Sequence, residues 1–339
     1  MTTTAELRVG VVGAGQMGAD HIKRLTHRIT GAHVSAIVEP DAARAAAAAE
    51  LAPGSVAFAS LEEAIAADAL DAVVIATPGK FHEPVLLPAI RAGLPTLCEK
   101  PLTEDAASSW RVLEAEMAGG KKVLQVGFMR RFDREYAQLR EFIAGKDAGE
   151  LLMLRCVHRN PSVLDYYTQE MLIADSVVHE FDVVPWLVGS SIRSVQVRHG
   201  RRNSLSPAHL DEPILVLIEL ENGVLADVEM NVSVQFGYQV ATEAVFEKGI
   251  ARIGQPAGMQ VWEDGRFSVG EHRSFVTRFA EAYDIEVQAW VDAAAQGTMA
   301  GPSAWDAYRV SVAVEAGVRA LHETGPVELD LPAQPDFYA

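Results

Sequence analysis

Residues Leu7–Gly18 read LRVGVVGAGQMG, an apolar, β-branched run that ends in a glycine-rich turn. The run predicts a buried strand, and the spacing of Ile22 and Leu25 beyond it predicts a helix. Glycines 13, 15 and 18 form the pattern G-x-G-x-x-G between strand and helix. The first glycine makes a tight turn, the second lets a pyrophosphate approach the backbone, and the third lets helix and strand pack closely. The stretch predicts a dinucleotide site at a helix N-terminus.

The next predicted strand, His33–Val38, ends at Glu39, about 20 residues beyond the last glycine. A carboxylate at this position can bind ribose hydroxyls and would repel a 2′-phosphate, so NAD is favoured over NADP. A plainer alternative is that Glu39 only begins the turn Glu39-Pro40-Asp41. Arg44 lies close enough in sequence to leave the use of NADP open.

Strands and helices alternate through the first part of the chain, which is the signature of a parallel, doubly wound α/β sheet. We expect residues 1–127 to form this nucleotide-binding domain. The further strands are predicted at 56–58, 71–76, 95–98 and 122–127, and the helices at 41–51, 61–67, 82–93 and 103–118.

Cys98-Glu99-Lys100-Pro101-Leu102 follows one of these strands. A lysine at the carboxyl end of a parallel strand points into the crevice where such sheets bind ligands. The proline after it biases Lys100 away from helical geometry, and the Lys100–Pro101 bond is a candidate for a cis peptide. A surface Lys-Pro after a strand is usually only a turn, so the role of Lys100 depends on the motifs around it.

The pattern changes after Gly127. A helix is predicted at 132–144 and a strand at 150–158, and period-two strands follow from 192 to about 270. Asn222-Gly223 and Asp264-Gly265 are strong hairpin turns. Residues 274–295 and 303–322 predict two amphipathic helices, the second with Ser303 as N-cap and Asp306 three residues later. We expect residues 128–339 to form an α+β domain with an open, mostly antiparallel sheet.

A helix predicted from about residue 170 or 175 carries Asp175 and His179, which are four residues apart and share a face. A carboxylate beside an imidazole orients it and raises its pKa, which suits a general base. The plainer alternative is that Asp175 caps the helix and His179 is a partly buried, hydrogen-bonded histidine.

The composition narrows the classes of partner. The chain has 339 residues and a net charge of −17, which argues against nucleic acid and anionic membranes as partners. The basic pairs Arg130-Arg131 and Arg201-Arg202 are expected on solvated faces or in ion pairs rather than at a phosphate. No window is long and apolar enough for a membrane span, and residues 1–6 show no signal core, so a cytoplasmic location is expected.

Neither a disulfide nor a metal site is expected. Cys98 and Cys156 form no C-x-x-C pair and fit a reducing compartment. His179-Glu180 begins an H-E-x-x-H motif, but Val183 stands where the second histidine would be.

Several motifs together resemble the Gfo/Idh/MocA family of sugar and cyclitol oxidoreductases, and within it the inositol-oxidising members of actinobacterial type. The resemblance covers nearly the whole chain. It implies an N-terminal Rossmann domain, late helices that pack back on that domain, and a homotetramer built through the open sheet. The motifs are Gly13–Gly18, Ala76-Thr77-Pro78 with His82, Glu99-Lys100-Pro101 and Gly127–Phe132, in that order.

The resemblance also implies residue roles. His179 acts as the base with Asp175 tuning it, and Lys100 hydrogen-bonds the reacting oxygen. Substrate contacts fall on Met129, His158, Asn160, Ser176 and Tyr238, although an aromatic such as Tyr238 in a sheet is as often part of the core. Cofactor contacts fall on Gly13, Gly15, Gln16, Met17, Gly18, Glu39, Thr77, Pro78, His82, Glu99 and Lys100.

The function that we expect is NAD-dependent oxidation of myo-inositol to 2-keto-myo-inositol (scyllo-inosose), by hydride transfer to the nicotinamide. A related dehydrogenase acting on scyllo-inositol, another cyclitol, an aldose or levoglucosan is an alternative. Further alternatives are a relative that oxidises a glycoside and then eliminates the aglycone, and a non-catalytic NAD sensor or assembly subunit. Lys100, Asp175 and His179 together argue against the sensor, which needs no proton relay.

Overall fold

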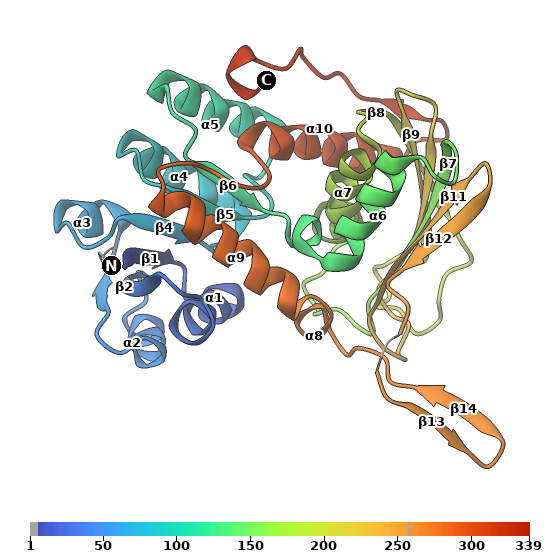
Figure 1. The fold of residues 1–339 in the computed structure, drawn as a ribbon, viewed down its shortest axis with the longest axis horizontal. Coiled ribbons are helices and arrows are strands. Elements are labelled where there is room, and N and C mark those ends of the chain that lie inside the picture. Colours follow the sequence, from blue (N-terminus) through green and yellow to red (C-terminus); the bar gives the residue numbers. More distant parts are fainter. Residues whose placement is uncertain (1–5, 257) are drawn as a thin grey trace. The chain divides into compact units, whose positions relative to one another are not determined.

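The computed structural model describes residues 6–256 and 258–339, and these divide into two units (Figure 1). The first unit contains the residues up to 129 together with 283–311 and 332–339. The second contains residues 130–282 and 312–331. Each unit is therefore assembled from segments that are far apart in the sequence.

The first unit holds the parallel sheet that the sequence predicts. Among the described residues it has six strands in the order β3-β2-β1-β4-β5-β6, every neighbouring pair being parallel. The strand order reverses between β1 and β4, which opens a crevice at their carboxyl ends. The strands are β1 (Leu7–Val12), β2 (Ala32–Val38), β3 (Val56–Phe58), β4 (Ala72–Ile75), β5 (Thr96–Glu99) and β6 (Leu124–Gly127).

Five helices between these strands are α1 (Gln16–His27), α2 (Ala42–Leu51), α3 (Leu61–Ala66), α4 (His82–Arg91) and α5 (Ala106–Gly119). A later helix, α9 (Ala280–Ala295), contributes to the same core. Trp290 of α9 is fully buried and packs with Ile22 and Leu25 of α1 and with side chains of β1 and β2. Figure 1 shows α9 beside α1.

The expected single helix at 274–295 is instead two helices, α8 (Phe275–Arg278) and α9, separated at Phe279. Phe279 leaves helical geometry, with φ −112° and ψ 18°, and its side chain is fully buried. Arg278 turns to the start of helix α6 (Arg134–Gly145), where its guanidinium lies 2.7 Å from an Asp133 carboxylate oxygen and 2.9 Å from one of Glu135. The amphipathic periodicity of the sequence did not indicate this break. The break coincides with the burial of Phe279 and with the ion pairs of Arg278, which involve residues distant in the sequence.

The second unit contains a seven-stranded mixed sheet, counted over the described residues, in the order β12-β11-β7-β10-β9-β8-β15. Its pairs are antiparallel except for the parallel pair of β7 and β10, so the expected open, mostly antiparallel sheet is confirmed. Its strands are β7 (Leu151–Arg159), β8 (Ile192–His199), β9 (Ile214–Leu220), β10 (Leu225–Asn231), β11 (Gln239–Phe246), β12 (Gly249–Ile253) and β15 (Val327–Glu328).

Helices α6 (Arg134–Gly145) and α7 (Val178–Val188) lie on one face of this sheet (Figure 1). The two predicted hairpin turns are confirmed: Asn222-Gly223 joins β9 to β10, and Asp264-Gly265 joins β13 (Gln260–Glu263) to β14 (Arg266–Val269). Asp264 and Gly265 have φ values of 49° and 71°, as a type I′ turn requires.

The predicted start of the last long helix is also confirmed. Helix α10 (Ala304–Ala320) follows Ser303, whose Oγ accepts the Asp306 N–H at 3.2 Å. The Asp306 carboxylate accepts the Ser303 N–H at 2.9 Å, which completes a capping box. No helix of the described chain is long and apolar enough to cross a membrane.

We expect Trp290→Ala to lower the free energy of unfolding by about 3–5 kcal/mol, because it empties a fully buried site in the first unit. Urea unfolding followed by fluorescence and circular dichroism measures the change. Trp262→Ala is the control: Trp262 is 70% exposed on β13 and should shift stability by less than about 0.5 kcal/mol. Equal effects of the two substitutions would contradict the place of α9 in this core.

Candidate active site

The carboxyl edge of the parallel sheet gathers most residues that the sequence assigns to cofactor binding. Gly13 follows β1, Glu39 follows β2, Thr77 lies just beyond β4 and Lys100 follows β5. In a parallel sheet these ends lie along one edge, at which open α/β sheets bind their ligands.

The glycine loop has the geometry that its spacing predicts. Gly13 has φ +91°, a conformation that residues with a side chain rarely adopt. A Cβ atom at Gly18 would overlap the carbonyl oxygen of Gly13, so only glycine lets α1 pack this closely on β1. A Cβ at Gly15 would meet nothing within 4 Å, and Gly15 caps α1 without a side-chain hydrogen bond. The first N–H groups of α1 are therefore not covered by a capping side chain, which suits a phosphate group.

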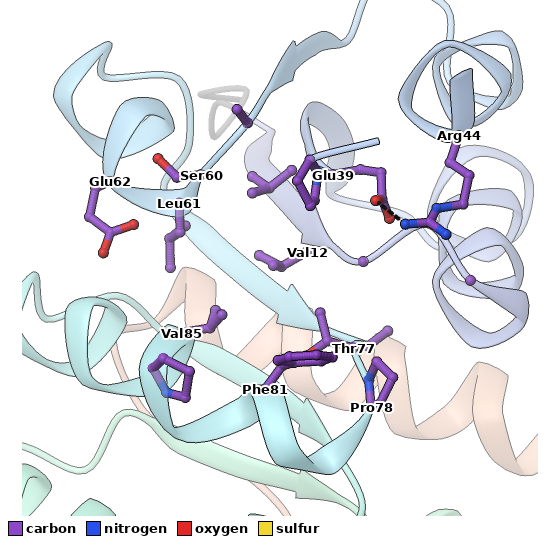
Figure 2. Close-up of a pocket in the computed structure, with 17 residues that line it drawn as sticks. Val12, Glu39, Arg44, Ser60, Leu61, Glu62, Thr77, Pro78, Phe81 and Val85 are labelled. Atoms are coloured by element: carbon purple, nitrogen blue, oxygen red, sulfur yellow. Dashed lines mark hydrogen bonds and ion pairs between the residues drawn. The ribbon is translucent and has the colours of Figure 1, made fainter. Parts of the chain in front are cut away.

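A pocket of about 630 Å³ opens beside this loop (Figure 2). Glu39 and Arg44 lie on one side of the pocket, and Thr77, Pro78 and Phe81 on another. Phe81 was not identified from the sequence. In the structure its side chain is half exposed, and it stands immediately before His82. Of the predicted cofactor residues the pocket is lined by Gly13, Gly15, Glu39, Thr77 and Pro78. The others, which do not line it, are Gln16, Met17, Gly18, His82, Glu99 and Lys100.

Glu39 joins the glycine loop to the start of α2. One carboxylate oxygen accepts the Ala14 N–H at 3.0 Å, and the other accepts the Asp41 N–H at 3.1 Å and an Arg44 guanidinium N–H at 2.8 Å. Burial alone would raise the pKa of Glu39, but these donors outweigh it and lower the pKa below its ordinary value. The carboxylate is therefore ionised, and its remaining lone pairs can accept ribose hydroxyls.

The segment around Lys100 is held by buried polar contacts. The Lys100–Pro101 peptide bond is cis, as the sequence suggested. The ring nitrogens of His82 lie 2.7 Å from the Pro101 carbonyl oxygen and 2.6 Å from that of Thr77. Burial lowers the pKa of His82, against the opposing influence of these carbonyl groups. His82 thus joins the backbone segments that follow the neighbouring strands β4 and β5.

His21 is a polar residue of this region that sequence analysis missed. It is fully buried in α1, and its Nε2 lies 2.7 Å from a carboxylate oxygen of Glu99. Its position three residues after Gly18, on the helix of the glycine loop, was the one available indication.

In the second unit, the segment that carries Asp175 and His179 begins as a π-helix (Leu172–Val177) and continues as α7. Asp175 is exposed, whereas His179 is buried, with 8% of its surface accessible. Asp175 lies inside the π-helix, so it is not the N-cap of the plainer alternative. Ser176 is buried, and its hydroxyl lies 2.7 Å from the Tyr167 hydroxyl. π-Helical segments inside helices occur frequently at functional sites.

Two further predicted substrate residues are neighbours in the same unit. The His158 ring centroid lies 6.1 Å from that of Tyr238 and 6.4 Å from that of His179. Tyr238 is 5% exposed and packs edge-on against Phe279, so it contributes to the core as well as facing His158. Asn160 follows β7, and within the described chain its buried Oδ1 has no hydrogen-bond partner. A buried polar atom in this condition is unfavourable unless a ligand satisfies it.

His158 contacts a buried ion pair that contains Arg130. For Arg130 the sequence had left open a solvated face or an ion pair. The Arg130 guanidinium, 1% exposed, pairs with the Glu180 carboxylate, and both groups lie 3.2 Å from His158 Nδ1. Burial would raise the pKa of Glu180, but Arg130 and His158 outweigh it and lower the pKa. Arg131 pairs in turn with Asp182. The expectation of a solvated face is wrong for this pair of arginines, and the ion-pair alternative is confirmed.

The predicted catalytic residues are divided between the units. Lys100 and Met129 belong to the first unit, whereas Asp175 and His179 belong to the second with the other predicted substrate residues. Both cysteines, Cys98 and Cys156, are buried free thiols. In the described part of the chain, no group of three or more His, Cys, Asp or Glu residues could hold a metal ion.

A parallel nucleotide-binding sheet with a glycine loop, followed by a unit with a carboxylate–histidine segment, defines a dinucleotide-dependent oxidoreductase. Residues 7–128 match the model of the oxidoreductase family with an NAD-binding Rossmann fold, and residues 136–252 match the GFO/IDH/MocA C-terminal domain. The chain belongs to the Gfo/Idh/MocA family of oxidoreductases. The cofactor is NAD, which this Rossmann domain binds. The open space at Gly15 suits its pyrophosphate, and the ionised Glu39 suits its ribose hydroxyls.

Relatives are similar over the whole chain. An inositol 2-dehydrogenase of Leifsonia xyli subsp. xyli is 68% identical, with 100% of both chains covered. One from Corynebacterium glutamicum is 65% identical over 98% of this chain and 99% of the relative. The crystal structure of myo-inositol dehydrogenase from Lactobacillus casei, in complex with NAD(H) and myo-inositol, has a TM-score of 0.95 and 31% identity, covering 98% of this chain and 100% of that one.

We expect Gly15→Ala and Gly18→Ala to have different effects. The methyl group at Gly15 enters open space beside the pocket, so it should leave the melting temperature unchanged and weaken NADH binding about tenfold or more. The methyl group at Gly18 overlaps the Gly13 carbonyl, so it should lower the melting temperature. Thermal melts without cofactor and NADH titration by fluorescence measure both. Unaltered NADH affinity in Gly15→Ala would contradict the placement of the pyrophosphate.

Proposed function

We propose that this protein is an NAD-dependent inositol 2-dehydrogenase, which oxidises myo-inositol to 2-keto-myo-inositol (scyllo-inosose). The observation that carries the proposal is similarity over the full chain to inositol 2-dehydrogenases, at 68% identity for one of them. The likeness to a myo-inositol dehydrogenase solved with NAD(H) and myo-inositol supports it. The groups that such a reaction needs, a base and an oxyanion-stabilising cation, are present as His179 and Lys100.

In the proposed reaction the carbinol carbon is oxidised to a ketone. NAD, when bound, accepts the hydrogen and two electrons that leave that carbon. His179 takes the hydroxyl proton, and Asp175 orients and tunes the imidazole. Lys100 hydrogen-bonds the reacting oxygen and stabilises the negative charge that develops on it. The protein contributes position and electrostatics.

The second unit supplies polar groups for a polyol. We assign hydroxyl contacts to His158, Asn160, Ser176 and Tyr238 of this unit, and a further substrate contact to Met129 of the first unit. A polyol requires several such partners, because each of its hydroxyls that is buried without one lowers affinity. The buried Oδ1 of Asn160 is an acceptor of this kind.

We also propose how the chain is organised as a working enzyme. Residues 1–127 bind NAD, and residues 128–339 bind the polyol and mediate assembly. The seven-stranded sheet carries exposed apolar side chains, among them Leu152, Leu215 and Leu225, which supports assembly of a homotetramer through it. The location that we propose is the cytoplasm, where NAD and a free thiol state are available.

We expect Lys100→Ala, Asp175→Ala and His179→Ala each to lower turnover of myo-inositol by at least about 10²-fold, because Lys100 and His179 act on the reacting hydroxyl and Asp175 orients His179. NADH binding should persist in all three. Absorbance at 340 nm reports turnover, and fluorescence titration reports NADH. His322→Ala, on an exposed histidine, is the control.

The wild-type protein is assayed with a panel of polyols, aldoses and glycosides. Preference for another polyol would replace myo-inositol as the substrate, and release of an aglycone without net NADH would indicate the eliminating reaction. Tight NADH binding with no turnover on any of them would indicate a sensor. Near-normal kcat in one of the alanine variants would remove that residue from the scheme.

We expect Glu39→Ala to reduce the preference for NAD over NADP. It removes the carboxylate that would bind the ribose and repel a 2′-phosphate, and it leaves the Arg44 guanidinium, now 2.8 Å from Glu39, without this partner. The measurement is the ratio of kcat/KM for the two cofactors. Glu50→Ala, at the exposed end of α2, the helix that carries Arg44, is the control. An unchanged ratio in Glu39→Ala would contradict the ribose assignment.

A further inference from the structure

Two histidines that take no part in the proposed proton and hydride transfer flank the Lys100 turn, which we define as residues Glu99–Leu102. His21 comes from α1 and His82 from the start of α4, and neither has any exposed surface. Burying an imidazole costs free energy unless its polar atoms find partners, so each is kept in place by specific contacts. The polar contacts of His21 Nε2 and of both His82 ring nitrogens go to the turn itself or to the backbone after the neighbouring strand, whereas His21 Nδ1 has no hydrogen-bond partner among the described residues.

His21 acts on the turn before Lys100. Its Nε2 lies 2.7 Å from Glu99 Oε1, and the other carboxylate oxygen of Glu99 accepts the backbone N–H of Lys100 at 3.3 Å. The Glu99 carboxylate therefore bridges the His21 ring to the Lys100 backbone. Gly127 of β6 leaves the space for it, since a Cβ there would lie only 3.2 Å from Glu99 Oε2.

The His21 ring is itself supported from α9. Tyr283 packs edge-on against it, with ring centroids 6.4 Å apart. The Arg24 guanidinium lies over the other ring, 5.3 Å from the Tyr283 centroid, and also pairs with Asp284. His21 is thus held by two helices of the first unit, and its position follows that of α1.

His82 acts on the turn after Lys100. Its Nδ1 lies 2.7 Å from the Pro101 carbonyl oxygen and its Nε2 lies 2.6 Å from the Thr77 carbonyl oxygen. Each neutral tautomer donates to one of these carbonyls, and the protonated ring donates to both. A Cβ at Gly79 would lie 2.9 Å from the Pro101 ring, so the backbone after Thr77 packs directly on the turn.

We propose that His21 and His82 are positioning residues for Lys100, which fix the backbone on its two sides. Through His21, the helix that carries the glycine loop also sets the position of Lys100. A lysine has a long, flexible side chain, so its ammonium can be placed reproducibly only if its own backbone is fixed. A shift of about 1 Å in a reacting group can cost about 10²-fold in rate. The catalytic part of this inference rests on the proposed role of Lys100.

The test uses substitutions at His21 that separate positioning from packing. His21→Leu fills the space without a donor, and His21→Gln replaces imidazole Nε2 with an amide nitrogen that can still donate to Glu99. The double variant His21→Leu/Glu99→Leu removes both partners, which avoids an unpaired buried carboxylate. His27→Leu is the matched control, because His27 is exposed on the same helix.

The first readout needs neither cofactor nor substrate. Hydrogen–deuterium exchange of the peptide that contains Lys100 reports whether its amide N–H stays bonded to Glu99. We expect faster exchange in His21→Leu and in the double variant, wild-type exchange in His27→Leu, and slow exchange restored in His21→Gln. Unchanged exchange in His21→Leu would overturn the proposal, whatever the protein's activity.

The second readout is steady-state kinetics with NAD and the preferred polyol. We expect kcat to fall about 10- to 100-fold in His21→Leu and in the double variant. In His21→Leu, KM and the NADH dissociation constant should change less than about threefold. His21→Gln should recover most of kcat. Normal kcat in the double variant would overturn the proposal, because the loss in His21→Leu would then come from the unpaired carboxylate.

His82→Leu tests the other side of the turn with the same measurements. It is expected to speed exchange beyond Pro101 and to lower kcat with a smaller effect on KM. If this variant does not fold, the His21 series alone decides. Faster exchange with unchanged kcat would also overturn the proposal, since the contacts would then be only structural. Failure of the proposed function is distinct: wild-type protein would turn over no polyol with NAD.

Discussion

The first unit depends on the approach of α1 to β1 at Gly13 and Gly18. Only the absence of a side chain at Gly18 lets the helix pack against the Gly13 carbonyl. That approach fixes where the first turn of α1, which Gly15 leaves without a covering side chain, lies beside β1, and it fixes where His21 of α1 meets Glu99. Cofactor site and lysine turn are therefore consequences of one steric constraint, so a change at either glycine affects both.

The second unit depends on a buried charge pair. The Arg130–Glu180 pair is almost completely removed from water, and such a pair is stabilising only when its geometry and additional hydrogen bonds offset the loss of hydration. His158 provides one of these contacts, so the group assigned to the polyol is also part of what holds the pair. If His158 binds the polyol as proposed, substrate recognition and stability are coupled at this position.

The parts of the fold that sequence could predict are those with local causes. Gly13, Gly18 and Glu39 followed from spacing, and the cap at Ser303 from hydrogen-bonding chemistry. The helix break at Phe279, the burial of Arg130 and the contact from His21 to Glu99 are set by partners distant in the chain. The π-helix around Asp175 is likewise not encoded by periodicity, because the apolar pattern of a short π segment differs little from that of an α-helix.

The first unit is built from the beginning and the end of the chain, and this affects how it can fold during synthesis on the ribosome. All six parallel strands are complete by Gly127, yet the apolar face that Trp290 covers has to wait for more than half of the remaining chain. Long-range contacts of this kind slow folding and leave apolar surface exposed in the meantime. The nascent first unit would thus bind chaperones until α9 emerges. Truncations late in the chain would destabilise the unit whose strands are made first.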